Sequence, residues 1–175
     1  MIKGVIFDLD LTLVDTSNME PLRRKGNWQG VYKAIPASTI YEGVEELVAH
    51  CRSLGLKVGV ATSSPSTYAT KVLAHHRIKF DALVAYHDTD RKKPHPDPLL
   101  LAAEKLGIKP THILAIGDDP KDVISAKAAS MTAVAACWGS INVENLEEED
   151  WDYSCANVAQ LHRLISELQK DGSDA

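Results

Sequence analysis

Short apolar runs alternate with stretches of helical periodicity along most of this chain. Val5-Ile6-Phe7 forms the first run. Later runs lie near residues 56–61, 81–85, 113–116 and 133–137. Continuous apolar runs are typical of parallel strands buried on both faces, and strands that alternate with helices predict a parallel sheet between two helical layers. We therefore expect an α/β fold, a three-layer α/β/α sandwich of the Rossmann type with a mostly parallel sheet.

Local signals place the helices between these strands. Apolar residues recur at helical spacing over 44–54 and 97–106, and glycines follow at Gly55 and Gly107, where helices commonly end. Ser64 before Pro65 predicts an N-cap and the first position of a helix that ends near residue 76. One further helix is expected after residue 122 up to about residue 131, and another from 158 to 168. The proline-rich stretch 86–98 predicts a loop.

Residues 15–43 interrupt this alternation and are called the insert below. The insert is polar, shows little apolar periodicity and contains a basic and aromatic group, Arg23, Arg24 and Trp28. Fewer than thirty residues cannot bury much surface by themselves, so we expect a short helix or a loop flap within a single domain covering 1–175. Arg23, Arg24 and Trp28 could bind a substrate, although a solvated group of charges fits the sequence equally well.

Polar side chains follow four of the predicted strands at their carboxyl ends. In open α/β sheets ligands bind at this edge. Two carboxylates held close together are unfavourable unless a cation lies between them or one is protonated, so the Asp8 and Asp10 pair predicts a site. In chain order the groups are Asp8 and Asp10, then Thr62 and Ser63, then Lys93, then Asp118, Asp119 and Asp122.

The stretch FDLDLTLVD at residues 7–15 resembles the first motif of the haloacid dehalogenase superfamily, Asp-x-Asp-x-Thr. The hydroxyl, the lysine and the later acidic pair match the other three motifs of that superfamily in order. The resemblance covers residues 4–122 and implies a Mg²⁺-dependent phosphatase that hydrolyses a phosphate monoester through an aspartyl phosphate. Position 11 is Leu, where the family commonly has Gly.

The resemblance also implies a role for each matching residue. Asp8 would be the nucleophile and a metal ligand, and Asp10 the general acid and base, with the backbone carbonyl at that position as a further ligand. Asp118 would be the third metal ligand. Thr62, with Ser63, would bind the phosphoryl group, and Lys93 would neutralise both that group and the nucleophile.

Asp119 and Asp122 are expected to orient water near the metal or to hold the lysine. Asp122 could instead be a favourable charge in the first turn of a helix, and Asp119 could face solvent. Lys92 competes with Lys93 for the cationic role, which the following Pro94 assigns to Lys93. His75, His76, His87 and His95 are read as surface or loop residues.

Composition narrows the class of protein. Lys and Arg number 19 and Asp and Glu 24, which gives a net charge of −5, and five of the acids lie in the run 144–150. The rest of the chain is neutral, so nucleic acid is not indicated except as a substrate with a phosphorylated end. Three scattered cysteines predict neither disulfides nor a zinc site. No signal peptide or apolar stretch of about 18 residues is present, which favours the cytoplasm and no membrane.

Other functions remain as alternatives. A phosphomutase would need a cover that excludes water, and the insert is short for that. A phospho-receiver or binding domain places its acidic pair first and its phosphorylated Asp on a later strand, in contrast to the order here. A dehalogenase does not need the acid at Asp10. An open site predicts a bulky phosphorylated substrate, or a homo-oligomer in which another subunit completes the cover.

Overall fold

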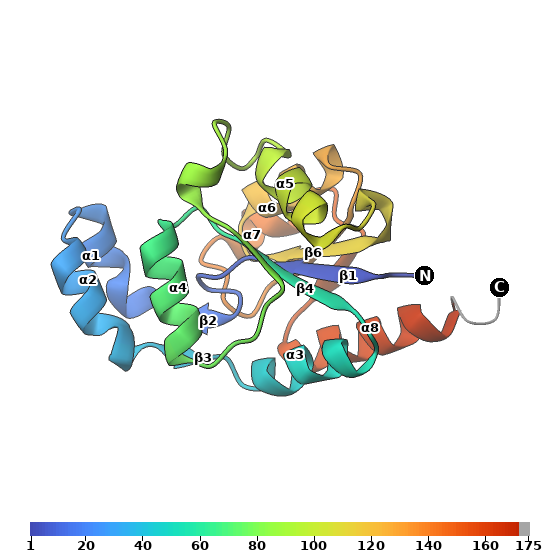
Figure 1. The fold of residues 1–175 in the computed structure, drawn as a ribbon, viewed down its shortest axis with the longest axis horizontal. Coiled ribbons are helices and arrows are strands. Elements are labelled where there is room, and N and C mark those ends of the chain that lie inside the picture. Colours follow the sequence, from blue (N-terminus) through green and yellow to red (C-terminus); the bar gives the residue numbers. More distant parts are fainter. Residues whose placement is uncertain (172–175) are drawn as a thin grey trace.

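The computed structural model describes residues 1–171, and a six-stranded parallel sheet is its main feature (Figure 1). The strand order is β5-β4-β1-β6-β7-β8. Because the chain first extends the sheet on one side of β1 and then on the other, the carboxyl ends of β1, β4 and β6 meet where the order reverses. The strands are β1 (Gly4–Phe7), β4 (Lys57–Ala61), β5 (Ala82–Val84), β6 (Ile113–Gly117), β7 (Thr132–Ala136) and β8 (Tyr153–Cys155).

Alternating residues of the central strand β1 face two different apolar cores. Val5 and Phe7 are fully buried in one core, and Ile6 belongs to the other. In the parallel register, Phe7 lies beside Val60 of β4 and Ile116 of β6. The continuous apolar run in the sequence reflects this burial on both faces.

Helices cover both faces of the sheet, so the predicted three-layer α/β/α fold is confirmed. Figure 1 shows α5 and α6 on one side of the sheet and α3 and α8 on the other. Helices α4 and α7 each contribute buried residues to one of the two cores. The helices are α3 (Val44–Ser53), α4 (Ser66–His75), α5 (Asp97–Leu106), α6 (Pro120–Ala128), α7 (Val143–Glu147) and α8 (Val158–Asp171).

The insert forms two short helices where the sequence predicts a short helix or a loop. Its side chains Met19, Val31 and Ile35 are buried in the same apolar core as Phe7. The insert therefore packs against the body of the protein, beside α4 (Figure 1). Its elements are η1 (Ser17–Met19), α1 (Glu20–Arg24), α2 (Trp28–Ala34) and η2 (Ile35–Ala37), and β2 (Val14–Asp15) pairs with β3 (Thr39–Ile40) at its ends.

Most predicted elements are present, with the following differences. The loop after β5 contains a short 3-10 helix, η3 (Tyr86–Asp88), and another, η4 (Pro110–His112), precedes β6. The sequence pattern did not predict β8 or α7. The predicted N-cap at Ser64 is wrong, because α4 begins at Ser66 and the Ser64 hydroxyl contacts Asp10 instead. In the described part of the chain, the structure contains no helix that is long and apolar enough to span a membrane.

Candidate active site

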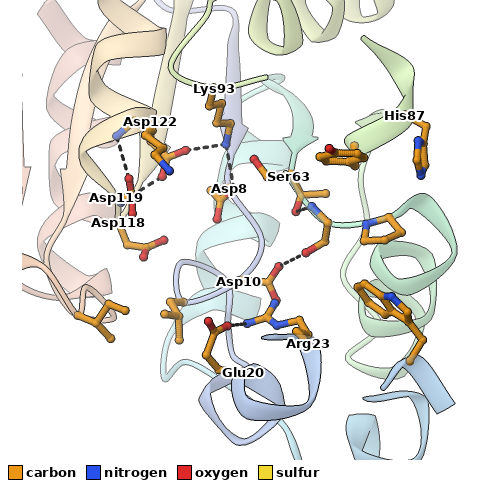
Figure 2. Close-up of a pocket in the computed structure, with 18 residues that line it drawn as sticks. Asp8, Asp10, Glu20, Arg23, Ser63, His87, Lys93, Asp118, Asp119 and Asp122 are labelled. Carbon is orange, nitrogen blue, oxygen red and sulfur yellow. Dashed lines mark hydrogen bonds and ion pairs between the residues drawn. The ribbon is translucent and has the colours of Figure 1, made fainter. Parts of the chain in front are cut away.

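A pocket of about 610 Å³ opens at the carboxyl edge of the sheet, where β1, β4 and β6 end. Its lining includes Asp8, Asp10, Thr62, Lys93 and Asp118. Figure 2 shows Lys93, Asp8 and Asp122 directed toward one another, while Asp10 and Arg23 meet on another side of the same pocket. The strand order thus brings together residues that lie more than one hundred positions apart in the sequence.

Lys93 links the candidate nucleophile to α6. Its amine donates hydrogen bonds to Asp8 Oδ1 at 2.9 Å, to Asp122 Oδ1 at 2.6 Å and to the carbonyl of Ala61 at 2.7 Å. Its side chain is only 5 % exposed. Burial by itself lowers the pKa of Lys93, but the Asp122 and Asp8 carboxylates outweigh it and raise the pKa above its ordinary value. The amine is therefore a fixed positive charge beside one oxygen of Asp8.

Gly117, the last residue of β6, makes room for this arrangement. A Cβ atom at Gly117 would lie 2.3 Å from the Asp122 carboxylate. Only glycine lets Asp122 lie against the strand while its Oδ1 reaches Lys93. Asp122 Oδ2 accepts a hydrogen bond from the backbone N–H of Asp119 at 3.1 Å, which fixes the carboxylate at the start of α6.

Three carboxylates form a compact acidic group in the pocket. Asp8, Asp118 and Asp122 each offer an oxygen atom within 4.8 Å of the others. Burial raises the pKa of Asp118 to about 7, and the Asp122 charge acts in the same direction, whereas the hydrogen bond from Thr12 opposes both. Burial also raises the pKa of Asp8 well above its usual range, Lys93 lowers it, and the neighbouring carboxylates raise it further.

This acidic group fits a divalent cation such as Mg²⁺. Three carboxylates that share a single lysine carry excess negative charge in a buried place, and a cation with oxygen ligands would balance it. The Thr12 hydroxyl donates to Asp118 Oδ1 at 2.7 Å, which orients that carboxylate. The ligand set expected from the sequence was the carboxylates of Asp8 and Asp118 with the backbone carbonyl of Asp10. In the structure the Asp10 side chain lies outside the acidic group and Asp122 lies within it.

Asp10 belongs to a separate network of hydrogen-bond donors. Its Oδ1 receives the Tyr68 hydroxyl at 2.6 Å and the Thr16 hydroxyl at 2.7 Å, and Arg23 Nη1 lies 2.6 Å away. Its Oδ2 receives the Ser64 hydroxyl at 2.7 Å. Asp10 is thus held by residues of the insert, of the loop after β4 and of α4.

The remaining predicted residues lie around these two groups. Thr62 is buried, and its hydroxyl accepts the backbone N–H of Ser64 at 3.1 Å, while Ser63 lines the pocket. Asp119 is the N-cap of α6 and accepts the backbone N–H of Lys121 at 2.9 Å, and in the described part of the chain it does not contact Lys93. Thr62 and Ser63 therefore lie where a phosphoryl group could contact them, and Asp119 has a local structural role.

The candidate substrate-binding residues of the insert, Arg23, Arg24 and Trp28, have different surroundings in the structure. Arg23 contacts Asp10 and Glu20, and Arg24 is 71 % exposed and pairs with Glu20 only through its Nε at 2.9 Å. Trp28 lines the pocket and packs edge-on against Tyr68, with ring centroids 6.2 Å apart. The role of Tyr68 could not be predicted from the sequence, because a tyrosine inside an apolar helical stripe gives no signal that its hydroxyl reaches a carboxylate.

The backbone conformation at position 11 explains why the family commonly has glycine there, although this chain has Leu11. Leu11 has φ 63°, a left-handed conformation that glycine adopts without steric cost. The carbonyl of Leu11 also lies so close to Gly139 that a Cβ there would be 1.8 Å from it. The turn after Asp10 is therefore tight on both sides, and Leu11 places an apolar side chain at the pocket.

Comparison with known proteins identifies the same family as the motifs. A family model described as haloacid dehalogenase-like hydrolase matches residues 18–130. A putative pyrophosphatase PpaX of Caldanaerobacter subterraneus is 29 % identical over 214 aligned positions, which cover 97 % of each chain. The 214 aligned positions exceed the 175 residues of this chain, so that relative contains segments with no counterpart here.

Two further proteins show the extent of the similarity. An N-acetylmuramic acid 6-phosphate phosphatase of Pseudomonas aeruginosa is 34 % identical over 134 residues, which cover 75 % of this chain and 59 % of that protein. The solved structure of a hydrolase from Pseudomonas syringae has the same fold, with a TM-score of 0.83 at 22 % identity over 95 % of this chain and 99 % of that one. The chain is a member of the haloacid dehalogenase-like hydrolase family.

Proposed function

We propose that this protein is a Mg²⁺-dependent phosphatase that hydrolyses a phosphate monoester through an aspartyl phosphate on Asp8. The observation that supports this most directly is the position of Asp8. Lys93 holds its Oδ1 at 2.9 Å, while Asp118 and Asp122 lie beside it in the acidic group. One oxygen of Asp8 is thus fixed by a cation and the other is available to attack phosphorus.

The proposed hydrolysis has two steps, and Asp8 and Asp10 take part in both. In the first, the free oxygen of Asp8 forms a bond to phosphorus while the bond to the leaving oxygen breaks. The electron pair stays on the leaving oxygen, which takes a proton from Asp10. In the second, a water attacks phosphorus and gives its proton to Asp10. The Asp8–phosphorus bond breaks, its electron pair returns to the carboxylate, and inorganic phosphate is released.

Other pocket residues would stabilise the negative charge on the phosphoryl oxygens. Asp8, Asp118 and Asp122 would hold the Mg²⁺, with the backbone carbonyl of Asp10 as a further ligand. The ion would supply positive charge for the phosphoryl oxygens. Lys93 adds a second positive charge on the same side, and Thr62 and Ser63 offer donors for the remaining oxygens.

Apolar side chains at the mouth of the pocket suggest the kind of leaving group. Leu11, Trp28, Tyr86 and Ile141 line it, and Ile141 is 67 % exposed. Because both Lys93 and Arg23 already hold carboxylates, neither is free to bind a second anionic group, and Lys121 is the other lysine of the lining. We therefore favour an alcohol with an apolar surface. Benzyl phosphate should be hydrolysed with a higher kcat/KM than phosphoglycolate; the opposite order would contradict this choice.

The test of the proposed mechanism replaces Asp8 by Asn. Loss of the nucleophile should lower phosphate release from an aryl phosphate by more than about a hundredfold, because lost nucleophiles cost several orders of magnitude. The matched control is Asp90→Asn, in the exposed loop after η3. Mass spectrometry of the acid-quenched wild type should detect a phosphoryl group on Asp8. Full activity of Asp8→Asn would rule out the covalent mechanism.

The same assay separates hydrolysis from phosphomutase-type transfer. A phosphatase releases one inorganic phosphate for each alcohol formed, whereas a mutase returns the phosphoryl group to the substrate. Equal amounts of phosphate and alcohol, dependent on added Mg²⁺ and abolished by a chelator, are the expected result.

A further inference from the structure

We infer that Arg23 is a positioning residue, which holds the Asp10 carboxylate in the orientation needed for proton transfer. This inference rests on the proposed function, because it assumes that Asp10 is the acid and base. Arg23 lies on α1 of the insert, and its Nη1 is 2.6 Å from Asp10 Oδ1. The two side chains are 14 % and 15 % exposed, so the ion pair is largely removed from solvent.

The donors around Asp10 are distributed unequally between its two oxygens. Among the described residues, Oδ1 accepts the hydroxyls of Tyr68 and Thr16 and pairs with Arg23 Nη1, whereas Oδ2 accepts the hydroxyl of Ser64 alone. A carboxylate oxygen has two lone pairs, so three donors occupy Oδ1 fully and one donor leaves a lone pair of Oδ2 unused. Oδ1 is therefore the anchored oxygen, and Oδ2 is the oxygen that can carry and transfer a proton.

Arg23 is itself held rigidly from three directions. Its Nη2 donates to Glu20 Oε2 at 2.8 Å, its Nη1 lies 3.4 Å from the Tyr68 hydroxyl, and its guanidinium lies 5.6 Å from the centre of the Tyr68 ring. Tyr68 is fully buried, so it provides a fixed surface for the guanidinium. A planar group held on several sides transmits its orientation to the carboxylate that it contacts.

These contacts argue against a substrate-binding role for Arg23. Its single positive charge is shared between two carboxylates, Asp10 and Glu20, so no excess positive charge remains for an anionic part of a substrate. Its exposed area is also small. A residue that binds the remote part of a substrate would matter only for substrates that reach it, whereas a residue that orients Asp10 matters whenever a proton is needed.

The experiment compares Arg23→Gln, Asp10→Asn and the double variant on two substrates. The leaving group of 4-nitrophenyl phosphate needs little proton donation, and that of benzyl phosphate needs it fully. We expect Arg23→Gln to lower kcat/KM, which reports the first step, on benzyl phosphate by at least about tenfold and on 4-nitrophenyl phosphate by less than about threefold. The double variant should match Asp10→Asn, because residues that act through one another are not additive.

Two controls separate positioning from folding. Arg52→Gln also removes a partly buried arginine from an Asp, since Arg52 Nη2 lies 3.1 Å from Asp81, and Arg52 lies outside the pocket. Arg52→Gln should leave the ratio of kcat/KM values on the two substrates unchanged. Tyr68→Phe removes one donor from Asp10 Oδ1 and keeps the ring, so it should shift that ratio in the same direction as Arg23→Gln. It also serves if Arg23→Gln does not fold.

The possible results lead to different conclusions. Equal losses on both substrates, or additive losses in the double variant, would overturn the inference and leave Asp10 as the acid and base. If Asp10→Asn itself affects both substrates equally, the proposed role of Asp10 fails, and the inference fails with it. Partial recovery of the benzyl phosphate rate in Arg23→Lys, which keeps the charge, would support positioning.

Discussion

Replacing Asp118 by Asn should stabilise the metal-free protein at alkaline pH, even though it removes a proposed metal ligand. Asp118 is buried, its pKa is raised from an ordinary value of 3.8 to about 7, and the main causes are burial and the charge of Asp122. Asn has the same shape, and its side-chain oxygen can still accept the hydrogen bond that Thr12 donates at 2.7 Å. The substitution therefore removes a charge and little else.

The magnitude follows from the difference between the two pKa values. A carboxyl group whose pKa is higher in the folded state than in the unfolded state stabilises the fold fully below the unfolded pKa. That contribution is lost as the pH rises through the folded pKa. For Asp118 this stability is lost between about pH 4 and about pH 7. Ionisation of Asp118 should cost roughly 4 kcal/mol at about pH 8 and roughly 2 kcal/mol at about pH 5.

Urea unfolding in the presence of a chelator measures this directly. The advantage of Asp118→Asn over the wild type should be roughly 2 kcal/mol larger at about pH 8 than at about pH 5. Mg²⁺ at 100 times its Kd should remove most of this advantage at about pH 8, because it stabilises the wild type by about 2.7 kcal/mol and the variant lacks a ligand. The control is Asp119→Asn, which keeps an N-cap and should respond to neither pH nor metal in this way.

One result would refute the reasoning. If Asp118→Asn is less stable than the wild type at both pH values without metal, the carboxylate is not an unfavourable charge in the metal-free pocket. The balance of charge that motivates the cation site would then be wrong.

Three further substitutions test other parts of the pocket. Gly117→Ala should cost about 1–3 kcal/mol of stability and most of the turnover, because its Cβ would lie 2.3 Å from Asp122; unchanged thermal melting and kcat would contradict this close approach. Lys93→Met should destabilise the metal-free protein by about 3–5 kcal/mol at neutral pH and less in acid, because it leaves buried carboxylates without their partner; a loss that does not depend on pH would show that packing is the cause. Trp138→Phe should cost about 1 kcal/mol in urea unfolding, since it removes the indole hydrogen bond to the carbonyl of Thr12 at 2.9 Å, and no change in stability would show that water replaces it.

The sequence was sufficient to predict the sheet and the residues at its carboxyl edge. An apolar run such as Val5-Ile6-Phe7 predicts a strand that is buried on both faces. Asp8, Lys93 and Asp118 each follow a predicted strand along the chain, which predicts that they lie at the same edge of the sheet. The strand β8 escaped prediction because Tyr153–Cys155 is too short to show a pattern and lies at the edge of the sheet.

Side-chain direction was the part that the sequence could not determine. Asp8 and Asp10 would point the same way if both were alternate residues of a strand, but β1 ends at Phe7. Beyond that point the backbone turns, with Leu11 at φ 63°, so strand alternation no longer applies. The carboxylate of Asp10 then meets Arg23, a residue whose charge in the sequence suggested a role toward the substrate.

The contact between Arg23 and Asp10 has a consequence for how members of this family can be recombined. An insert that only covers the pocket could be exchanged for one from another protein, and the exchange would alter substrate preference alone. Here Arg23 and Thr16 of the insert are two of the four residues that hold the Asp10 carboxylate. The insert also buries Met19 and Val31 in the main core. A chimera with a foreign segment at residues 15–43 would therefore lose proton transfer together with selectivity, unless the new segment places an arginine against Tyr68.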